Sequence, residues 1–199
     1  MLSELLSFAA LGFQHIVALD AFDHVLFLLV LAAIYRGRDW RQVLWVISAF
    51  TVGHSITLAL AVTNVLVLPS RLVEFLIPLT IIATGIENII QRTHASQSVF
   101  STRRVLFAAA FGLVHGAGFA GYLRSLFLDS IAVPLLGFNL GIEAGQIVVL
   151  AATAVLFRLV DRGLSIAVPS RDPFPLRLCV VSLTVTLIAT EWAWQRFPR

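Results

Sequence analysis

Residues 43–66 have the sequence VLWVISAFTVGHSITLALAVTNVL, which contains no Asp, Glu, Lys or Arg. About 20 mostly apolar residues are enough for an α-helix to cross the hydrocarbon core of a bilayer. The stretch therefore predicts a transmembrane helix. It also places one imidazole, that of His54, near the middle of that helix.

The rest of the chain has the same character. Of its 199 residues, 59% are hydrophobic and only 13% are charged, whereas a soluble domain carries about 25% charged residues. Six helices of ~20 residues would occupy about 60% of the chain. This composition excludes a soluble globular protein and a disordered one. It predicts an all-α integral membrane protein with a single transmembrane domain over residues 1–199.

Arg, Pro and short polar links divide the apolar sequence into six predicted helices. The first is longer than one crossing needs, so we expect a break or bulge near residues 19–22. Link 158–175, with three prolines, is predicted to be a surface loop. The six predicted helices are approximately 9–35, 43–66, 72–91, 104–127, 132–157 and 176–195.

The basic residues are all arginines, and ten of the 14 fall in the alternate links 36–41, 92–104 and 158–177. The positive-inside rule then places these links in the cytoplasm and both termini outside. Charges that mark topology in this way do not indicate a nucleic-acid partner. The expected partners are the lipid bilayer and a metal ion, and a homo-oligomer remains open. A single cysteine excludes a thiolate cluster within one chain.

Two pairs of segments resemble each other. AFTVGH at 49–54 matches AFGLVH at 110–115, and GIE occurs at 85–87 and 141–143. Two helices per unit preserve direction, so this pattern predicts a parallel repeat with its axis along the membrane normal. Chance similarity between apolar segments is the alternative.

Ionisable side chains at membrane depth cost at least ~2.5–3.5 kcal/mol each, so they indicate function. In the first predicted helix, Asp23 and His24 supply a carboxylate and an imidazole suited to Ni²⁺, Co²⁺ or Zn²⁺. The alternative is a pair that only holds helices together. The central His54 and His115 are predicted to face one site. Ala108, Gly112 and Gly116 form a stripe of small residues beside His115 that allows close helix packing.

Helix 132–157 has two distinct faces. Asn139, Glu143 and Gln146 share one face, and a glycine stripe at 137, 141 and 145 lies nearly opposite. We expect the glycines to pack tightly and the polar face to line a channel. The predicted metal ligands are Asp23, His24, His54, His115 and Glu143. Secondary candidates are His15, Asp20, Glu87, Asn139, Gln146 and Ser55.

Three of these stretches, at 50–58, 111–120 and 138–146, resemble the motifs of the HupE/UreJ family of membrane proteins, and the likeness spans residues 12–158 in order. The closer likeness is to its HupE/UreJ-like branch. The resemblance implies a small polytopic protein of the bacterial cytoplasmic membrane that moves Ni²⁺, or else Co²⁺, inward for hydrogenase or urease maturation.

One departure from the family pattern has geometric consequences. The family motif has five residues between a His and Asp-His, whereas seven separate His15 from Asp23 here. On a continuous helix the nine-residue step from His15 to His24 is ~900°, which puts the two rings on opposite faces. Either the helix is broken near Asp20, or His15 leaves the site and Asp20 competes for its place.

Three functions remain open. The first is a permease for Ni²⁺ or Co²⁺ with Glu87 as a cytoplasmic-side relay, unless Glu87 is simply ion-paired. Its uptake should fall as the pH drops and protonates the imidazoles. The second is an intramembrane hydrolase with Zn²⁺ on the same ligands and Glu143 or Asp20 as general base. The third is a structural protein with an architectural metal.

Overall fold

The structure is a computed structural model of the whole chain. It describes the backbone of residues 1–18, 22–91, 102–126, 131–167, 169 and 172–198, and the side chains of these residues except 38 and 120–126. Within this part every regular element is helical, which confirms the all-α prediction. The elements are α1 (Leu2–Val17), α2 (Phe22–Ala33), the 3₁₀ turn η2 (Gly37–Asp39), α3 (Trp40–Val62), α4 (Ser70–Gln91), α5 (Thr102–Leu126), α6 (Ala132–Ala167) and α7 (Phe174–Gln195).

Four of these helices, α3, α4, α6 and α7, are long and apolar enough to cross a membrane. α1 and α2 meet these criteria only as a pair, and the chain bends by 68° between them. The predicted break in the first segment is therefore confirmed. α5 does not meet the same criteria, but it packs along α3 inside the bundle. The result is roughly the predicted six-helix membrane protein.

Two of the predicted boundaries are wrong. The first helix starts at Leu2 instead of residue 9, and α6 continues to Ala167 instead of ending near 157. The polar sequence from Arg158 onward led us to predict a loop, but charged residues such as Arg are good helix formers. At 1.5 Å per residue the 36 residues of α6 span ~54 Å, well beyond the ~30 Å hydrocarbon core. Its last turns thus extend past the core as helix.

The most extensive contacts are between α3 and α5, α1 and α6, and α4 and α7. The glycine stripe of α6 lies directly on the backbone of α1. A Cβ added at Gly137 or Gly141 would overlap the carbonyl oxygen of Leu5 or Ala9 respectively. A step of four residues from Gly137 to Gly141 on α6 thus matches a step of four residues from Leu5 to Ala9 on α1. The two helices are therefore parallel. The predicted tight packing of this stripe is confirmed.

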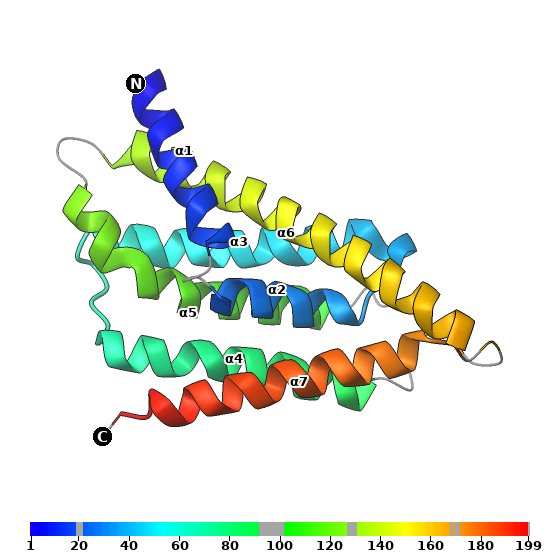
Figure 1. Cartoon of the computed structure of the whole chain (residues 1–199). Coiled ribbons are helices and arrows are strands. Elements are labelled where there is room, and N and C mark those ends of the chain that lie inside the picture. The colour runs from blue at the N-terminus through cyan, green and yellow to red at the C-terminus, as the bar shows by residue number, and fades with distance from the viewer. Residues whose placement is uncertain (19–21, 92–101, 127–130, 168, 170–171, 199) are drawn as a thin grey trace.

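α3 and α5 form a second parallel pair. Added Cβ atoms at Gly112 and Gly116 would overlap the carbonyl oxygens of Phe50 and His54. Gly53 faces Ala109 in the same way. Figure 1 shows that α4 and α6 also run in one direction. These orientations are the ones that the predicted parallel repeat requires.

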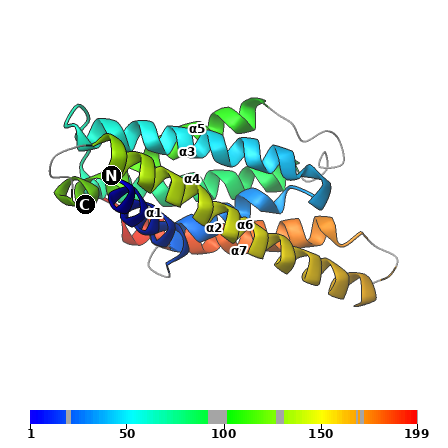
Figure 2. The ribbon, with the colours of Figure 1, turned by 90° about the horizontal axis from the view of Figure 1, so that it is seen from above.

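Both chain termini lie at one end of the bundle (Figure 1). At the other end α2, α4 and α6 finish and α3, α5 and α7 begin, so the described helix ends that flank the arginine-rich links lie there. We call it the arginine end and the opposite one the terminal end. Figure 2 shows the bundle from above, with α6 and α7 extending furthest toward the arginine end.

Candidate metal centre

The bend between α1 and α2 brings two histidines together in the middle of the bundle. The ring centroids of His15, near the end of α1, and His24, in the first turn of α2, are 4.6 Å apart. A straight helix would have placed them on opposite faces. The chain has two more residues between His15 and Asp23 than the family motif. Because the helix is broken between them, His15 still lies beside His24.

Two further helices contribute to the same place. The ring centroid of His54 on α3 lies 6.1 Å from that of His15 and 6.3 Å from that of His24. The ring of His115 on α5 lies 5.3 Å from His24. We call these four residues, contributed by α1, α2, α3 and α5, the histidine cluster. The predicted meeting of the histidines of α3 and α5 with that of α2 is what the structure shows.

A carboxylate fixes the orientation of His24. Nδ1 of His24 lies 3.0 Å from Oδ1 of Asp23, which also accepts a 2.9 Å hydrogen bond from the backbone N–H of His24. A carboxylate can only accept, so Nδ1 carries the hydrogen. The lone pair of His24 is then on Nε2, which is buried and has no hydrogen-bond partner among the described groups.

A hydroxyl orients His115 in the same way. Thr80 Oγ1 donates to the carbonyl oxygen of Ile77 at 2.7 Å and lies 3.0 Å from Nε2 of His115. The one hydrogen of that hydroxyl is therefore used, and Nε2–H of His115 must donate to it. This leaves the lone pair on Nδ1, which is buried and unpartnered within the described structure.

His54 has a still more unusual environment. Its side chain is fully buried, at 0% exposure, and neither ring nitrogen has a partner in the described part of the chain. Nε2 of His15 is buried without a partner as well. Leaving a buried polar group unsatisfied costs ~1–3 kcal/mol. Four rings with unsatisfied nitrogens in one place indicate a site for a ligand that accepts lone pairs.

Aromatic rings cover part of the cluster. Phe119 lies 4.1 Å from the ring of His15 and stacks on Phe138 at 5.2 Å. Phe27 and Phe50, 4.9 Å apart, lie 5.2 Å and 5.1 Å from the ring of His115. In such a low-dielectric surrounding, polar contacts to an ion are stronger than in water.

A pocket of about 390 Å³ reaches the cluster from the terminal end. His15, Asp23, His24 and His115 line it together with Glu74 and Arg196. Glu74 and Arg196 also line a second pocket at the terminal end, of about 560 Å³. His15, His24 and His115 are thus accessible from the end at which the chain starts and finishes, whereas His54 does not line this pocket.

The cluster is not a preformed coordination sphere. Among the described residues, no group of three or more His, Cys, Asp or Glu side chains is placed so that it could hold a metal ion. The four rings surround one region, but their nitrogens do not converge on one point. Imidazoles of the cluster would have to turn for joint ligation.

The other predicted site residues have different surroundings. Glu143 and Asn139 are half-buried on α6 and do not line the pocket at the cluster. Gln146 is buried and accepts a 2.8 Å hydrogen bond from Thr51, which links α6 to α3. Ser55 donates to the carbonyl oxygen of Thr51. Asp20 lies outside the described residues, and the roles of all these residues as ligands stay predictions.

Glu87 belongs to the arginine end, as its place in the sequence suggested. It lies 4.0 Å from the guanidinium of Arg104 and accepts a hydrogen bond from Gln91 at 2.9 Å. Arg104 is buried, donates to Gln91 and lies over the ring of Tyr35. The structure thus gives Glu87 an ion-pair partner, and its role as a relay stays a prediction.

Two contributors were not predicted from the sequence. These are Glu74, and the contact of Thr80 with His115. Glu74 shares a helix face with the buried Ile77 and Ile81, and a carboxylate at the end of a buried face was the available signal. For Thr80 there was no such signal, because the contact joins residues 35 positions apart.

The comparison with known families agrees with this architecture. The model of the HupE / UreJ protein family matches residues 1–196, nearly the whole chain. The chain belongs to the HupE/UreJ family. This family is generally associated with nickel and cobalt transport. No curated protein and no solved structure shows significant similarity to the chain. Family and apolar helices together make this HupE/UreJ protein an integral membrane protein.

Proposed function

We propose that this HupE/UreJ protein is a permease for a divalent transition metal, Ni²⁺ in the first place and Co²⁺ in the second. The cargo ion binds the histidine cluster in the middle of the bundle. The observation that carries the proposal is the set of unpartnered buried nitrogens on His15, His24, His54 and His115. Neutral imidazole is a suitable ligand for Ni²⁺, Co²⁺ and Zn²⁺.

The neighbours of the cluster support ligation. A metal-binding histidine commonly donates its second N–H to a carboxylate or other acceptor, which fixes the tautomer. Asp23 accepts from His24 in this way, and Thr80 accepts from His115. Both histidines then present a free lone pair to the same region. The carboxylate of Asp23 also offsets part of the positive charge of the ion.

The two ends of the bundle suggest a direction. At the terminal end the pocket that leads to the histidines is open, and Glu74 and Arg196 line it together. At the arginine end the buried Arg104 of α5 donates to Gln91 and lies 4.0 Å from Glu87, both on α4. Binding would occur from the terminal end, and release requires a movement at the arginine end. With the arginine end in the cytoplasm, as the positive-inside rule predicts, this corresponds to inward transport across the bacterial cytoplasmic membrane.

No observation on the described residues favours the zinc hydrolase alternative. A metal with three protein ligands and an open position for water would be needed, and the cluster does not present three converging ligands. A cargo site that binds and releases has no need of such a fixed sphere.

Uptake into proteoliposomes tests the permease. Radioactive Ni²⁺ is supplied outside, and its accumulation is measured for the wild type and for the double variant His54→Ala, His115→Ala. We expect the double variant to accumulate no more than protein-free vesicles. His94→Ala is the matched control, since the sequence places His94 in a link, and it should transport like the wild type. Unchanged uptake by the double variant would refute the proposal.

A further inference from the structure

A third pocket, of about 390 Å³, lies at the arginine end, away from the histidine cluster. It is enclosed by the end of α2, the start of α3, the second half of α6 and the start of α7. Its size falls in the range of small-molecule sites. Its walls combine apolar side chains with three arginines, Arg36, Arg158 and Arg177. The permease proposal does not use it.

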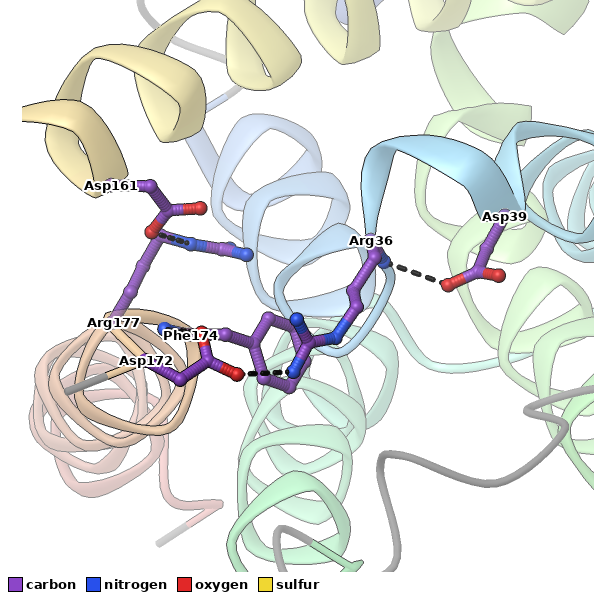
Figure 3. Close-up of polar contacts among 6 residues, drawn as sticks. All are labelled: Arg36, Asp39, Asp161, Asp172, Phe174 and Arg177. Carbon is purple, nitrogen blue, oxygen red and sulfur yellow. Dashed lines mark hydrogen bonds and ion pairs between the residues drawn. The ribbon is translucent and has the colours of Figure 1, made fainter. Parts of the chain in front are cut away.

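Two of the arginines form ion pairs with aspartates that line the same pocket (Figure 3). Arg36 donates from Nη2 to Asp172 at 2.7 Å and lies over the ring of Phe174 at 4.1 Å. Arg177 is buried and donates from Nε to Asp161 at 2.8 Å. The charges of both guanidiniums are therefore balanced within the protein.

Arg158 differs from these two. It has no ion-pair or hydrogen-bond partner within the part of the chain that the structure describes, although it lines the pocket. Its guanidinium reaches across to the link between α2 and α3, where a Cβ at Gly37 would lie 3.8 Å from Nη2. The charged side chains that line the pocket are three arginines and two aspartates, Asp161 and Asp172. The pocket thus has one uncompensated cation, that of Arg158, which favours an anion.

The apolar side chains of the pocket indicate which class of anion it binds. Leu44 on α3 and Ile147 on α6 line the pocket and are also 38% and 50% exposed on the outside of the helices. In an integral membrane protein this outside is in contact with acyl chains. Trp40, 57% exposed at the same pocket, has the indole expected at headgroup level. A free inorganic anion would make no favourable contact with the apolar side chains Leu44 and Ile147.

We propose that the pocket binds one anionic phospholipid, with its phosphate on Arg158 and an acyl chain along Leu44 and Ile147. Basic pockets between helices on the cytoplasmic side are suited to anionic headgroups. A planar guanidinium matches the oxygens of a phosphate by paired hydrogen bonds. The bound lipid lies between α3 and α6, next to the ion pairs that Arg36 and Arg177 form with Asp172 and Asp161.

Native mass spectrometry of the purified protein tests this site. The protein is titrated with phosphatidylglycerol and with phosphatidylcholine of identical acyl chains, and the first binding event is compared. We expect phosphatidylglycerol to bind more tightly than phosphatidylcholine. Arg158→Gln should raise the Kd of phosphatidylglycerol about tenfold, because the hydrogen bond from a charged guanidinium to the phosphate is lost. Arg162→Gln, one turn further on the same helix and not in the pocket lining, is the matched control and should bind like the wild type.

A second variant probes the apolar wall. Ala154→Phe fills the pocket from α6 and should weaken phosphatidylglycerol binding while Ni²⁺ binding is unchanged, so this test is independent of the permease. Equal weakening by Arg158→Gln and Arg162→Gln would overturn the proposal, because it would show diffuse charge attraction. Equal binding of both lipids, or displacement of phosphatidylglycerol by inorganic phosphate at similar concentration, would overturn it as well.

Discussion

At the scale of single residues, the chemistry of the histidine cluster depends on the neighbours that hold its protons. Asp23 and Thr80 each accept one N–H, and so determine which nitrogen of His24 and His115 keeps a lone pair. Composition and spacing predicted that histidines of different helices meet. They could not predict the tautomers, because those follow from contacts that only the packed bundle creates.

Replacing the carboxylate next to His24 should therefore weaken metal binding without removing a ring. We expect Asp23→Asn to lower Ni²⁺ affinity ~10–100-fold, the usual effect of losing such a partner of a metal-binding histidine. Isothermal titration calorimetry of the purified protein measures this. Glu191→Gln, which changes an exposed carboxylate on α7, should leave the affinity unaltered. An Asp23→Asn protein with wild-type affinity would show that this carboxylate does not support the site.

At the scale of helices, glycines decide which pairs come into close contact. The stripe on α6 was readable from the sequence, since small residues four apart are known to allow close helix approach. The sequence could not predict that this stripe packs on α1, because nothing in the sequence of α6 selects α1 over another apolar helix. The end of α6 was mispredicted for a related reason, as polarity marks the edge of the membrane and not the end of a helix.

A methyl group on the stripe should separate α1 from α6. Gly141→Ala would push a Cβ against the carbonyl oxygen of Ala9, and overpacking of this kind costs ~1–3 kcal/mol. We expect a lower thermal unfolding midpoint in detergent. Gly163→Ala lies in the same helix with nothing within 4 Å of the added atom, and it should be neutral or slightly stabilising. The same loss in both variants would contradict close packing along the stripe.

The ion pair between Arg36 and Asp172 joins the end of α2 to the start of α7. The hydrogen bond from Arg36 holds the pKa of the Asp172 carboxyl below its ordinary value of 3.8. A lowered pKa in the folded state stabilises the fold above that pH range, and this contribution is lost as the pH falls through it. Because the pair is exposed, we expect Asp172→Asn to cost only ~0.2–1 kcal/mol at neutral pH.

The same variant should match the wild type once the pH is low enough to protonate the carboxyl. Urea unfolding of both proteins across the acid range follows this convergence. A difference that stays constant down to the lowest pH would show that the effect of Asp172→Asn does not come from the charge.

At the scale of the whole molecule, the sequence predicted a helical membrane protein with its arginine links on one side, and the described helix ends that flank these links lie at one end of the bundle. It also anticipated that a break in the first segment would be needed to keep His15 near His24. The open pocket with Glu74 and Arg196 could not be anticipated, because it joins residues from α1, α2, α4, α5 and the segment after α7.

The predicted orientation leads to a direct test. With the arginine end in the cytoplasm, both termini face outside. We expect alkaline phosphatase, which is active only outside the cytoplasm, to be active when fused to residue 199. Fused after residue 91, at the arginine end, it should be inactive. The reverse pattern would invert the direction proposed for transport.

X-ray absorption at the nickel edge shows whether the histidine cluster binds the cargo ion. The purified protein is loaded with Ni²⁺, and the spectra of the wild type and of His54→Ala, His115→Ala are compared. We expect imidazole scattering from several ligands in the wild type and its loss or marked reduction in the double variant. Nickel bound only by oxygen, or an identical imidazole signal in both proteins, would contradict this expectation.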